Sequence, residues 1–384
     1  MIAFKLAYKN IIGAGLRTWL NVSVLSLAFV LIIFYNGMID GWNRQGRNDT
    51  QNWEIGQGQY WHPKYDKYDV FSIKDAHQAI SKSMLEWIEE GTLVPQLIQQ
   101  ATVYPQGRMQ GVILRGIPAN QMVLKLPTKV LNYQQNGTVA IIGKRMAKAT
   151  RLQVNDQVLL RWRDKNNTFD AKKITIAAIF NCDVAEVDVG QLYINYDTMQ
   201  DMMGFDNEAT FLVSAIEESP HLAGWNFKSA DWLLKDLDDL INSERISGMV
   251  MQLILLMIAL LAIFDTQILS IFRRKKEIGT YIALGLTRNQ VVGIFTVEGG
   301  MHSILAAVVG AIYGIPLFVW INSIGISFGS ADMGMTIAET IYPYYSIQLV
   351  VATVLLVLIS ATIVSYIPAK KIAQMRPTDA LKGK

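Results

Sequence analysis

The feature that most constrains this chain is a long apolar stretch, residues 247–272, that ends in the charged run Arg273–Glu277. A helix needs about 20 apolar residues to cross the hydrocarbon core of a membrane. Clustered Lys and Arg residues are retained on the cytoplasmic side. The stretch therefore predicts a transmembrane helix, and the basic run predicts its cytoplasmic end.

Three further apolar stretches have the length of a membrane span, and they occupy residues 19–39, 291–321 and 347–367. Lys and Arg occur before the first stretch and after the last one, whereas the segment 322–346 contains neither. This asymmetry predicts that both termini are cytoplasmic and that residues 322–346 and 40–246 lie on the external side.

The segments that flank the spans are short. Residues 1–18 interleave apolar side chains with basic ones, which predicts an amphipathic helix on the cytoplasmic face. The apolar stretch that follows has no small-residue cleavage site, so we expect an uncleaved anchor. We expect residues 273–290 to form a compact cytoplasmic segment and residues 368–384 to form a cytoplasmic tail.

Residues 40–246 read as a soluble domain. The whole chain is 51% hydrophobic and 17% charged, against about 45–50% and 25% in an average protein, and the apolar excess is confined to the spans. Alternation in 152–161 and 173–180, around the turn residues Asp164–Asn167, predicts a β-hairpin. The predicted fold class is a membrane protein with four transmembrane α-helices and a large mixed α+β domain between the first and second. We expect two lobes in that domain, formed by residues 45–130 with 205–240 and by residues 131–204.

The sequence offers little enzyme chemistry. It has no G-x-x-x-x-G-K-[ST] phosphate loop, and its four His residues are scattered without the spacing of metal ligands. We therefore expect a non-catalytic chain that itself binds no cofactor and no metal, and that has no nucleic-acid partner. The single cysteine, Cys182, is expected to be a small buried residue.

Three polar residues interrupt the spans, namely Asp265, Glu298 and His302. A charged group in the membrane costs several kcal/mol, so such residues face the bundle interior or water. They could form a proton or substrate path, or they could lie near the inner interface and bond to neighbouring helices or basic residues. The second interpretation is favoured because Asp265 and Glu298 are within about 12 Å of a cytoplasmic helix end at a rise of about 1.5 Å per residue.

Three short motifs lie in and after the last three spans. The first is Arg273-Arg-Lys-Lys-Glu-Ile-Gly-Thr-Tyr-Ile-Ala-Leu-Gly285, the second is Phe295-Thr-Val-Glu-Gly299, and the third ends in Pro-Thr-Asp-Ala-Leu381. Together with the order of one span, an external domain and three spans, they resemble the FtsX/MacB/LolCE permease superfamily. Asp265 stands at a position that is commonly Asn in that superfamily.

The resemblance implies a permease subunit in the bacterial inner membrane that forms a dimer with an identical or homologous subunit. Such permeases also bind a separate cytoplasmic ABC ATPase, which holds ATP and Mg. They convert ATP hydrolysis into motion of a periplasmic domain, and they do not conduct solute through a channel. The segment after the second span docks on the ATPase. The residues assigned to this coupling by the motif are Arg274, Lys275, Glu277, Ile278, Gly279, Leu284 and Gly285.

Within the superfamily, the strands expected at 174–180 and 186–194 resemble the lipoprotein-releasing LolC/LolE type. There a lipoprotein is extracted from the inner membrane and handed to a periplasmic carrier. Two alternatives stay open: a MacB-type efflux permease for peptides or amphiphiles, and an FtsX-like relay that activates a cell-wall hydrolase. The residues expected to contact the carrier are Arg161, Arg163 and Lys165. The residues expected to contact membrane lipid or substrate are Leu27, Phe34, Met251 and Leu255.

Overall fold

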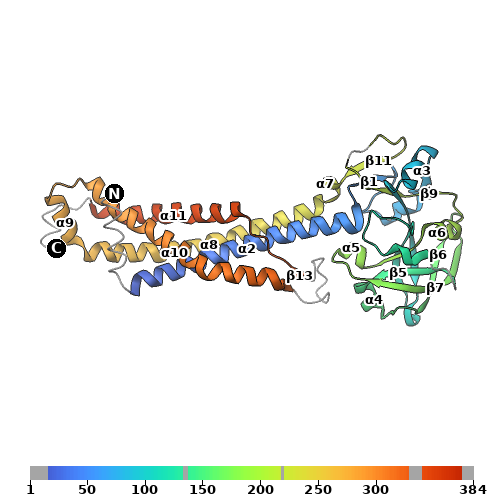
Figure 1. Cartoon of the computed structure of the whole chain (residues 1–384), viewed down its shortest axis with the longest axis horizontal. Coiled ribbons are helices and arrows are strands. Elements are labelled where there is room, and N and C mark those ends of the chain that lie inside the picture. Colours follow the sequence, from blue (N-terminus) through green and yellow to red (C-terminus); the bar gives the residue numbers. More distant parts are fainter. Residues whose placement is uncertain (1–15, 133–136, 218–219, 328–339, 374–384) are drawn as a thin grey trace. The chain divides into compact units, whose positions relative to one another are not determined.

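The structure is a computed structural model that describes residues 16–132, 137–217, 220–327 and 340–373 (Figure 1). The expected amphipathic N-terminal helix and the expected cytoplasmic tail lie largely outside the described residues, as do residues 328–339 of the 322–346 loop. The chain divides into two compact units. The helical unit comprises Met1–Trp42, Leu240–Ile326 and Ile341–Lys384, and the inserted domain comprises Asn43–Asp239 and Ser327–Thr340.

Four helices within the described residues are long and apolar enough to cross a membrane. They are α2 (Leu16–Thr50), α8 (Lys235–Arg273), α10 (Arg288–Ile324) and α11 (Ile347–Ala373). The predicted fold class is therefore confirmed. The helices extend beyond the apolar stretches, because the polar residues at their ends also have adequate helix propensity. Hydropathy therefore identifies only the part of each helix that suits lipid, and not the full length of the helix.

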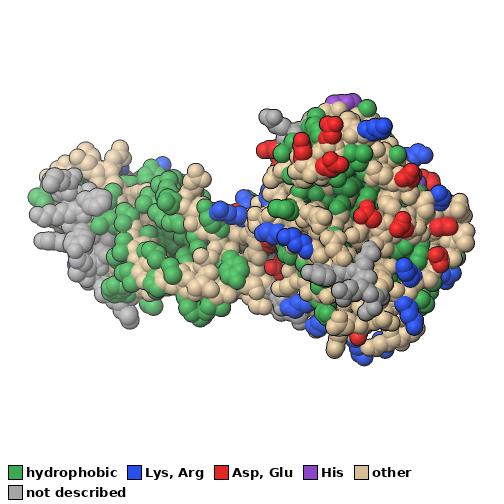
Figure 2. Space-filling model, turned by 45° about the vertical axis from the view of Figure 1, so that its right-hand side comes forward, with side chains coloured by type: hydrophobic (Ala, Val, Ile, Leu, Met, Phe, Trp, Pro, Cys, Tyr) green, Lys and Arg blue, Asp and Glu red, His purple; other side chains and the backbone are tan. Residues whose placement is uncertain are grey.

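Helix α2 is the most enclosed of the four. In its most apolar window 56% of the residues are buried, against 17% in each of the other three helices. Its buried residues Leu25 and Phe29 pack in one cluster with Ile263 of α8, Ala306 of α10 and Ala361 of α11. Figure 2 shows hydrophobic side chains over the helices of the helical unit and most of the charged side chains over the inserted domain. The outward apolar surface of the helical unit is thus suited to lipid.

The inserted domain is built on a nine-stranded sheet in the order β11-β1-β10-β3-β4-β8-β5-β7-β6. An additional pairing between β3 and β6 closes the six strands β3, β4, β8, β5, β7 and β6 into a ring. Closure of a sheet removes exposed strand edges, which would otherwise invite association. The strands are β1 (Gly58–Trp61), β3 (Leu93–Val103), β4 (Gln110–Ile117), β5 (Val139–Gly143), β6 (Gln157–Arg163), β7 (Phe169–Phe180), β8 (Gln191–Asn195), β10 (Phe211–Ser214) and β11 (Asn226–Ser229).

Shorter elements complete the inserted domain and the segment between α8 and α10. The helices among them are η1 (Gln51–Ile55), η2 (Val70–Asp75), α3 (Lys82–Glu89), η3 (Pro105–Gly107), η4 (Thr128–Asn132), α4 (Lys144–Thr150), α5 (Ala185–Asp188), α6 (Tyr196–Met203), α7 (Ala230–Leu233) and α9 (Lys275–Ala283). The two-residue strands are β2 (Gln78–Ala79), β9 (Glu208–Ala209), β12 (Ile326–Ser327) and β13 (Thr340–Ile341).

The sheet carries an apolar cluster on each face. Ala140 and Ile142 of β5 belong to one cluster and Ile141 to the other, and β8 divides its residues in the same way. Successive side chains of a strand point to opposite faces, so this alternation produces two cores. The segments expected as two lobes supply adjacent halves of the one sheet, joined by the β4–β8 and β3–β6 pairings. The predicted β-hairpin is present as β6 and β7, which pair in antiparallel register.

Candidate functional site

The segment expected to be cytoplasmic, residues 273–290, begins with a break between α8 and α9 at Arg274. Its backbone torsions, φ −99° and ψ 17°, depart from the helix, although its N–H still donates to the carbonyl of Ser270 at 3.1 Å. The carbonyl of Arg274 then accepts the first hydrogen bond of α9, from Ile278 at 3.0 Å. One residue therefore ends α8 and starts α9.

The side chain of Arg274 joins three neighbours. Its Nε donates to Oε2 of Glu277 at 2.7 Å, and its Nη1 donates to Oε2 of Glu298 at 3.1 Å. Its guanidinium carbon lies 5.0 Å from the ring centroid of Phe295, which suits a cation–π contact. We call Arg274, Glu277, Phe295 and Glu298 the Arg274 cluster. It ties the α8–α9 junction to α10.

The Phe-x-x-Glu-Gly motif now has a physical explanation. Phe295 and Glu298 are buried beneath Arg274. A side chain at Gly299 would collide with Ser365 of α11, because its Cβ would lie 1.8 Å from the Ser365 hydroxyl oxygen. The motif thus supplies an aromatic face, an acidic partner and a close approach of two helices. Small residues at helix contacts have this role in membranes.

The structure separates the three polar residues of the spans. Glu298 pairs with Arg274, as the inner-interface interpretation expected, and His302 is buried with Nδ1 2.8 Å from the carbonyl oxygen of Glu298. Asp265 is exposed and forms no hydrogen bond or ion pair with any described residue. Asp265 therefore does not join Glu298 and His302 in a common path.

Sequence reasoning missed two buried polar residues, Gln267 and Ser365. The Gln267 carbonyl oxygen and the Ser365 hydroxyl are buried without a partner among the described residues. Gln267 stands midway between the buried Ile263 and Ile271 at helical spacing, and this period could have indicated that it faces inward. Nothing comparable in the sequence marks Ser365.

The turn between α9 and α10 explains the glycine at the end of the first motif. Gly285 has φ +99°, a conformation that favours glycine. Its neighbour Leu286 donates to the carbonyl of Tyr281 at 3.1 Å, which closes the end of α9. Thr287 then begins α10 with a capping box to Gln290.

The coupling residues divide by exposure. Ile278 is 3% exposed and packs with Val291 and Phe295, and Gly279 is also buried. These two residues hold α9 against the helical unit and do not offer an outward surface. Glu277 and Leu284 are exposed, Leu284 by 75%. Lys275 is half-buried with its Nζ 4.7 Å from the ring centroid of Phe272.

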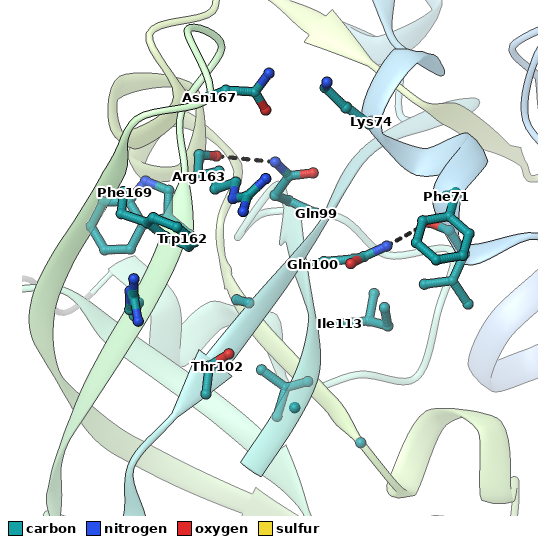
Figure 3. Close-up of a pocket in the computed structure, with 16 residues that line it drawn as sticks. Phe71, Lys74, Gln99, Gln100, Thr102, Ile113, Trp162, Arg163, Asn167 and Phe169 are labelled. Atoms are coloured by element: carbon teal, nitrogen blue, oxygen red, sulfur yellow. Dashed lines mark hydrogen bonds between the residues drawn. The ribbon is translucent and has the colours of Figure 1, made fainter. Parts of the chain in front are cut away.

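A second candidate site is a groove of about 740 Å³ on the inserted domain. We call it the β-groove. It is formed by the outward faces of β3, β4, β6 and β7 and is bordered by η2. In Figure 3, Phe169 and Phe71 lie on opposite sides, with Gln99 and Gln100 between them. Gln99 Nε2 donates to the carbonyl of Arg163 at 3.0 Å, so the hairpin is fastened to β3.

The β-groove is cationic. Its described lining contains Lys74, Arg161 and Arg163 and no acidic residue. The guanidinium carbons of Arg161 and Arg163 lie 3.8 and 4.4 Å from the ring centroid of Phe169. Neither arginine forms an ion pair within the described residues. Lys165 lines a small adjoining pocket that shares Lys74, Gln99 and Asn167 with the β-groove, and its side chain contacts Gly204. Arg161 and Arg163 thus line the β-groove together with Lys74, whereas Lys165 lines only the adjoining pocket.

The residues expected to contact lipid or substrate are exposed to different degrees. Leu27 of α2 and Met251 of α8 are exposed, by 53% and 60%. Phe34 and Leu255 are only half-exposed. The first two residues are therefore the more accessible from the lipid.

Helices α2 and α8 are joined in both units. In the inserted domain Arg47 of α2 pairs at 2.5 Å with Asp231 of α7 and with Asp238 of α8. In the helical unit Arg245 of α8 pairs with Asp40 of α2 at 2.7 Å. These partly exposed pairs contribute little energy singly, but together they hold the two helices side by side.

Comparison with known proteins places this architecture. The model of the family described as FtsX-like permease C-terminal matches residues 249–377. LolC of Xylella fastidiosa, a lipoprotein-releasing system transmembrane protein, is 23% identical over 309 residues, which cover 72% of this chain and 74% of the relative. An ABC transporter permease of Methanocaldococcus jannaschii is 22% identical over 55% of each chain, so this chain spans about half of that relative's length. The macrolide export protein MacB of Mannheimia succiniciproducens is 27% identical over 40% of this chain and 22% of its own.

Two solved structures share part of the arrangement at low similarity. The periplasmic region of MacB from Actinobacillus actinomycetemcomitans has a TM-score of 0.32 and 11% identity over 48% of this chain and 94% of its own. The extracellular domain of YknZ, a transporter from Gram-positive bacteria, has a TM-score of 0.25 and 12% identity over 42% of this chain and 83% of its own.

The four helices and the inserted sheet define a multipass membrane protein with a folded domain between its first two spans. Its last three spans match the FtsX-like permease C-terminal family, and the chain as a whole is similar to ABC transporter permeases of the FtsX/MacB/LolC type.

Proposed function

We propose that this chain is the permease subunit of an inner-membrane ABC transporter and converts ATP hydrolysis by a cytoplasmic partner into motion of its inserted domain. The ATPase supplies the ATP and Mg site, and a second permease subunit completes the membrane assembly. The observation that carries the proposal is the junction at Arg274, where the exposed helix α9 is tied to the membrane helices by a buried ion pair.

The first step of the mechanism takes place at α9. Its exposed Glu277 and Leu284 are available to a docking ATPase, while Ile278 anchors the same helix on an apolar cluster. A push on α9 reaches α10 through Glu298 and reaches α8 through the backbone of Arg274. At the α9 end, this chain positions the ATPase contact and transmits force to α8 and α10.

The second step runs along α8. This helix continues without interruption for 39 residues, from Lys235 to Arg273. An α-helix rises about 1.5 Å per residue, so α8 can carry a displacement over roughly 60 Å. The pairs of Arg47 and Arg245 keep α2 and α8 moving together.

For the substrate, we favour release of a lipoprotein from the outer leaflet of the inner membrane. The 74% coverage of the LolC relative supports this choice over the two alternatives, the MacB-type efflux permease and the FtsX-like relay. Leu27 and Met251 would meet the acyl chains. The β-groove would receive the periplasmic carrier, because its cations and exposed aromatic rings favour an anionic surface with apolar side chains.

The direct test is purification of the chain from its native membrane together with bound proteins and lipids. We expect an ABC ATPase and a triacylated lipoprotein, with the lipoprotein lost on addition of ATP. Co-purification with a membrane-fusion adaptor would support the MacB type, and a cell-wall hydrolase would support the relay. Absence of any ATPase under conditions that retain the dimer would overturn the proposal.

The orientation is tested separately. With both termini cytoplasmic, Asn166→Cys should react with a membrane-impermeant thiol reagent in intact spheroplasts, and Arg288→Cys should not. The native Cys182 is buried, and burial raises the pKa of its thiol to about 12, so it gives little background. The opposite labelling pattern would refute this orientation.

A further inference from the structure

The end of α2 is joined to the sheet of the inserted domain by a buried ion pair. Helix α2 passes at Thr50 into the π-helix η1, and Glu54 of η1 faces Arg115 of β4. The side chains of Glu54 and Arg115 are 13% and 9% exposed. Single π-helical turns are rare and occur frequently at functional sites.

Arg115 is held more tightly by the sheet than by Glu54. Its Nε donates to Oε1 of Gln191 on β8 at 2.5 Å, and its Nη1 donates to Oε1 of Gln96 on β3 at 3.3 Å. The distance from its Nη2 to Oε1 of Glu54 is 3.5 Å. The amide nitrogen of Gln96 is buried without an acceptor within the described residues. In this network the longest contact is the one between Arg115 and Glu54, and the amide nitrogen of Gln96 is a donor without an acceptor.

Two of the strands that hold Arg115, β3 and β4, also form the β-groove, and the third, β8, begins next to it. On β4, Ile113 lines the groove, and side chains two residues apart share a face, so Arg115 lies on the same face. On β3, Gln96 and the groove residue Gln100 are four residues apart, an even spacing that also places them on one face of the sheet. On β8, Gln191 directly follows the groove residue Gly190.

We propose that Arg115 links the end of α2 to the β-groove, so that separation of Glu54 from Arg115 changes the shape of the groove. The inference rests on the proposed function, because it treats the groove as a docking site and α2 as a moving element. It adds a specific joint: Arg115 and Glu54 act as positioning residues that transmit helix motion into two groove-forming strands, β3 and β4, and into β8, which begins next to the groove.

Proton uptake by Glu54 offers a way to open this joint without a partner protein. Glu54 is faced by Arg115 of β4, Glu186 of α5, Tyr193 of β8 and Tyr65 of the segment after β1. The pKa of Glu54 is raised to about 7, mainly because the group is buried; Arg115 lowers this pKa and the Glu186 carboxylate raises it. Glu54 is therefore mostly ionised at pH 8 and mostly protonated at pH 6, where Arg115 keeps its charge and loses its ionic partner.

The test measures the groove directly in the full-length chain in lipid nanodiscs. Spin labels at Val70→Cys and Thr168→Cys flank the groove, and their separation is read by pulsed electron paramagnetic resonance. We expect acidification from pH 8 to pH 6 to shift the distance distribution by about 2 Å, the scale of element shifts in switching proteins. Glu54→Gln should show the shifted distribution at both pH values.

The matched control is Glu86→Gln, the same chemical change at an exposed position of α3, which should behave as the unsubstituted chain. If Glu54→Gln lowers the melting temperature strongly, Glu54→Asp replaces it, since the shorter side chain keeps its charge but withdraws from Arg115. An unchanged distribution in the Glu54 variant that folds, or a pH response that survives in it, would overturn the joint. The spin-label measurement needs neither the ATPase nor the carrier, so it tests the joint alone. The proposed function is tested separately, by the co-purification experiment.

Discussion

Arg274 in the helical unit and the two arginines of the β-groove are the same residue type in opposite surroundings. Arg274 is largely buried and satisfied by two carboxylates and an aromatic face. Arg161 and Arg163 are exposed, stack on one Phe ring and have no described acidic partner. A paired, buried arginine maintains an arrangement of helices, whereas exposed unpaired arginines leave charge available to another molecule. This difference is consistent with the proposed function, in which the first region transmits force and the second recognises another molecule.

The strongest challenge to this comparison is to remove the buried partner. Glu298→Ala leaves Arg274 without its buried carboxylate, and breaking a buried ion pair costs about 3–5 kcal/mol. We expect a clear loss of thermal stability in detergent and loss of coupling between ATP hydrolysis and the periplasmic event. Glu277→Ala removes the exposed partner of the same arginine and should cost less than about 1 kcal/mol. Equal effects of the two changes would remove the distinction between buried and exposed pairing.

The second prediction concerns the buried pair of the inserted domain and its pH dependence. The folded-state pKa of Glu54, about 7, is above its ordinary value of 4.5, so the folded chain binds more protons between these pH values. The associated stability is present below about pH 4.5 and is lost as the pH rises through about 7, a change of up to about 3 kcal/mol. In chemical unfolding of the full chain, Glu54→Gln should lose less stability than the unsubstituted chain between pH 5 and pH 8. Parallel pH profiles would contradict the assignment.

The third prediction sharpens the recognition side. Arg161→Ala with Arg163→Ala should weaken carrier binding about tenfold to a hundredfold, equivalent to about 1.4–2.7 kcal/mol, with little change in melting temperature. The residual binding should depend less on salt, because exposed charges are screened. Lys165→Ala is the matched control, since Lys165 lies outside the β-groove. The measurement is the carrier affinity of each variant at two salt concentrations. A larger loss of affinity in Lys165→Ala than in the double variant would indicate that the carrier binds at the hairpin tip and not in the β-groove.

The smallest expected effect tests the backbone that presents α9. Gly285→Ala forces a side chain into a left-handed conformation and should cost about 1–2 kcal/mol. Gly293→Ala lies within α10, where a new Cβ meets no neighbouring atom, and should be neutral or slightly stabilising. Thermal melting of both variants gives the comparison. If Gly285→Ala is as harmless as Gly293→Ala, the turn does not require its glycine.

Several parts of the fold could be predicted because they depend on local pattern. The four spans follow from apolar stretches long enough to cross a membrane, and the hairpin of β6 and β7 follows from alternation around turn residues. The helix ends were less predictable. Helix α8 begins at Lys235, well before its apolar stretch, because polar residues can continue a helix that hydropathy does not mark.

The candidate sites show the same division. The motif residues of α9 could be identified from the sequence, but their roles could not, since Ile278 turns inward and Leu284 outward. The cationic hairpin was visible as Arg161 and Arg163, whereas Lys74 joins them only because η2 borders the same groove.

The sequence by itself determined the number of spans, the place of the inserted domain and the motifs of the permease family, because hydropathy and short motifs are properties of contiguous residues. Only the tertiary structure decided which charges meet. Arg274 pairs with Glu298 across 24 positions of sequence, and Glu54 with Arg115 across 61. Asp265, which has the same local appearance as Glu298, faces outward instead. Ion pairing depends on separations of a few ångströms, which the packing of helices and the pairing of strands set.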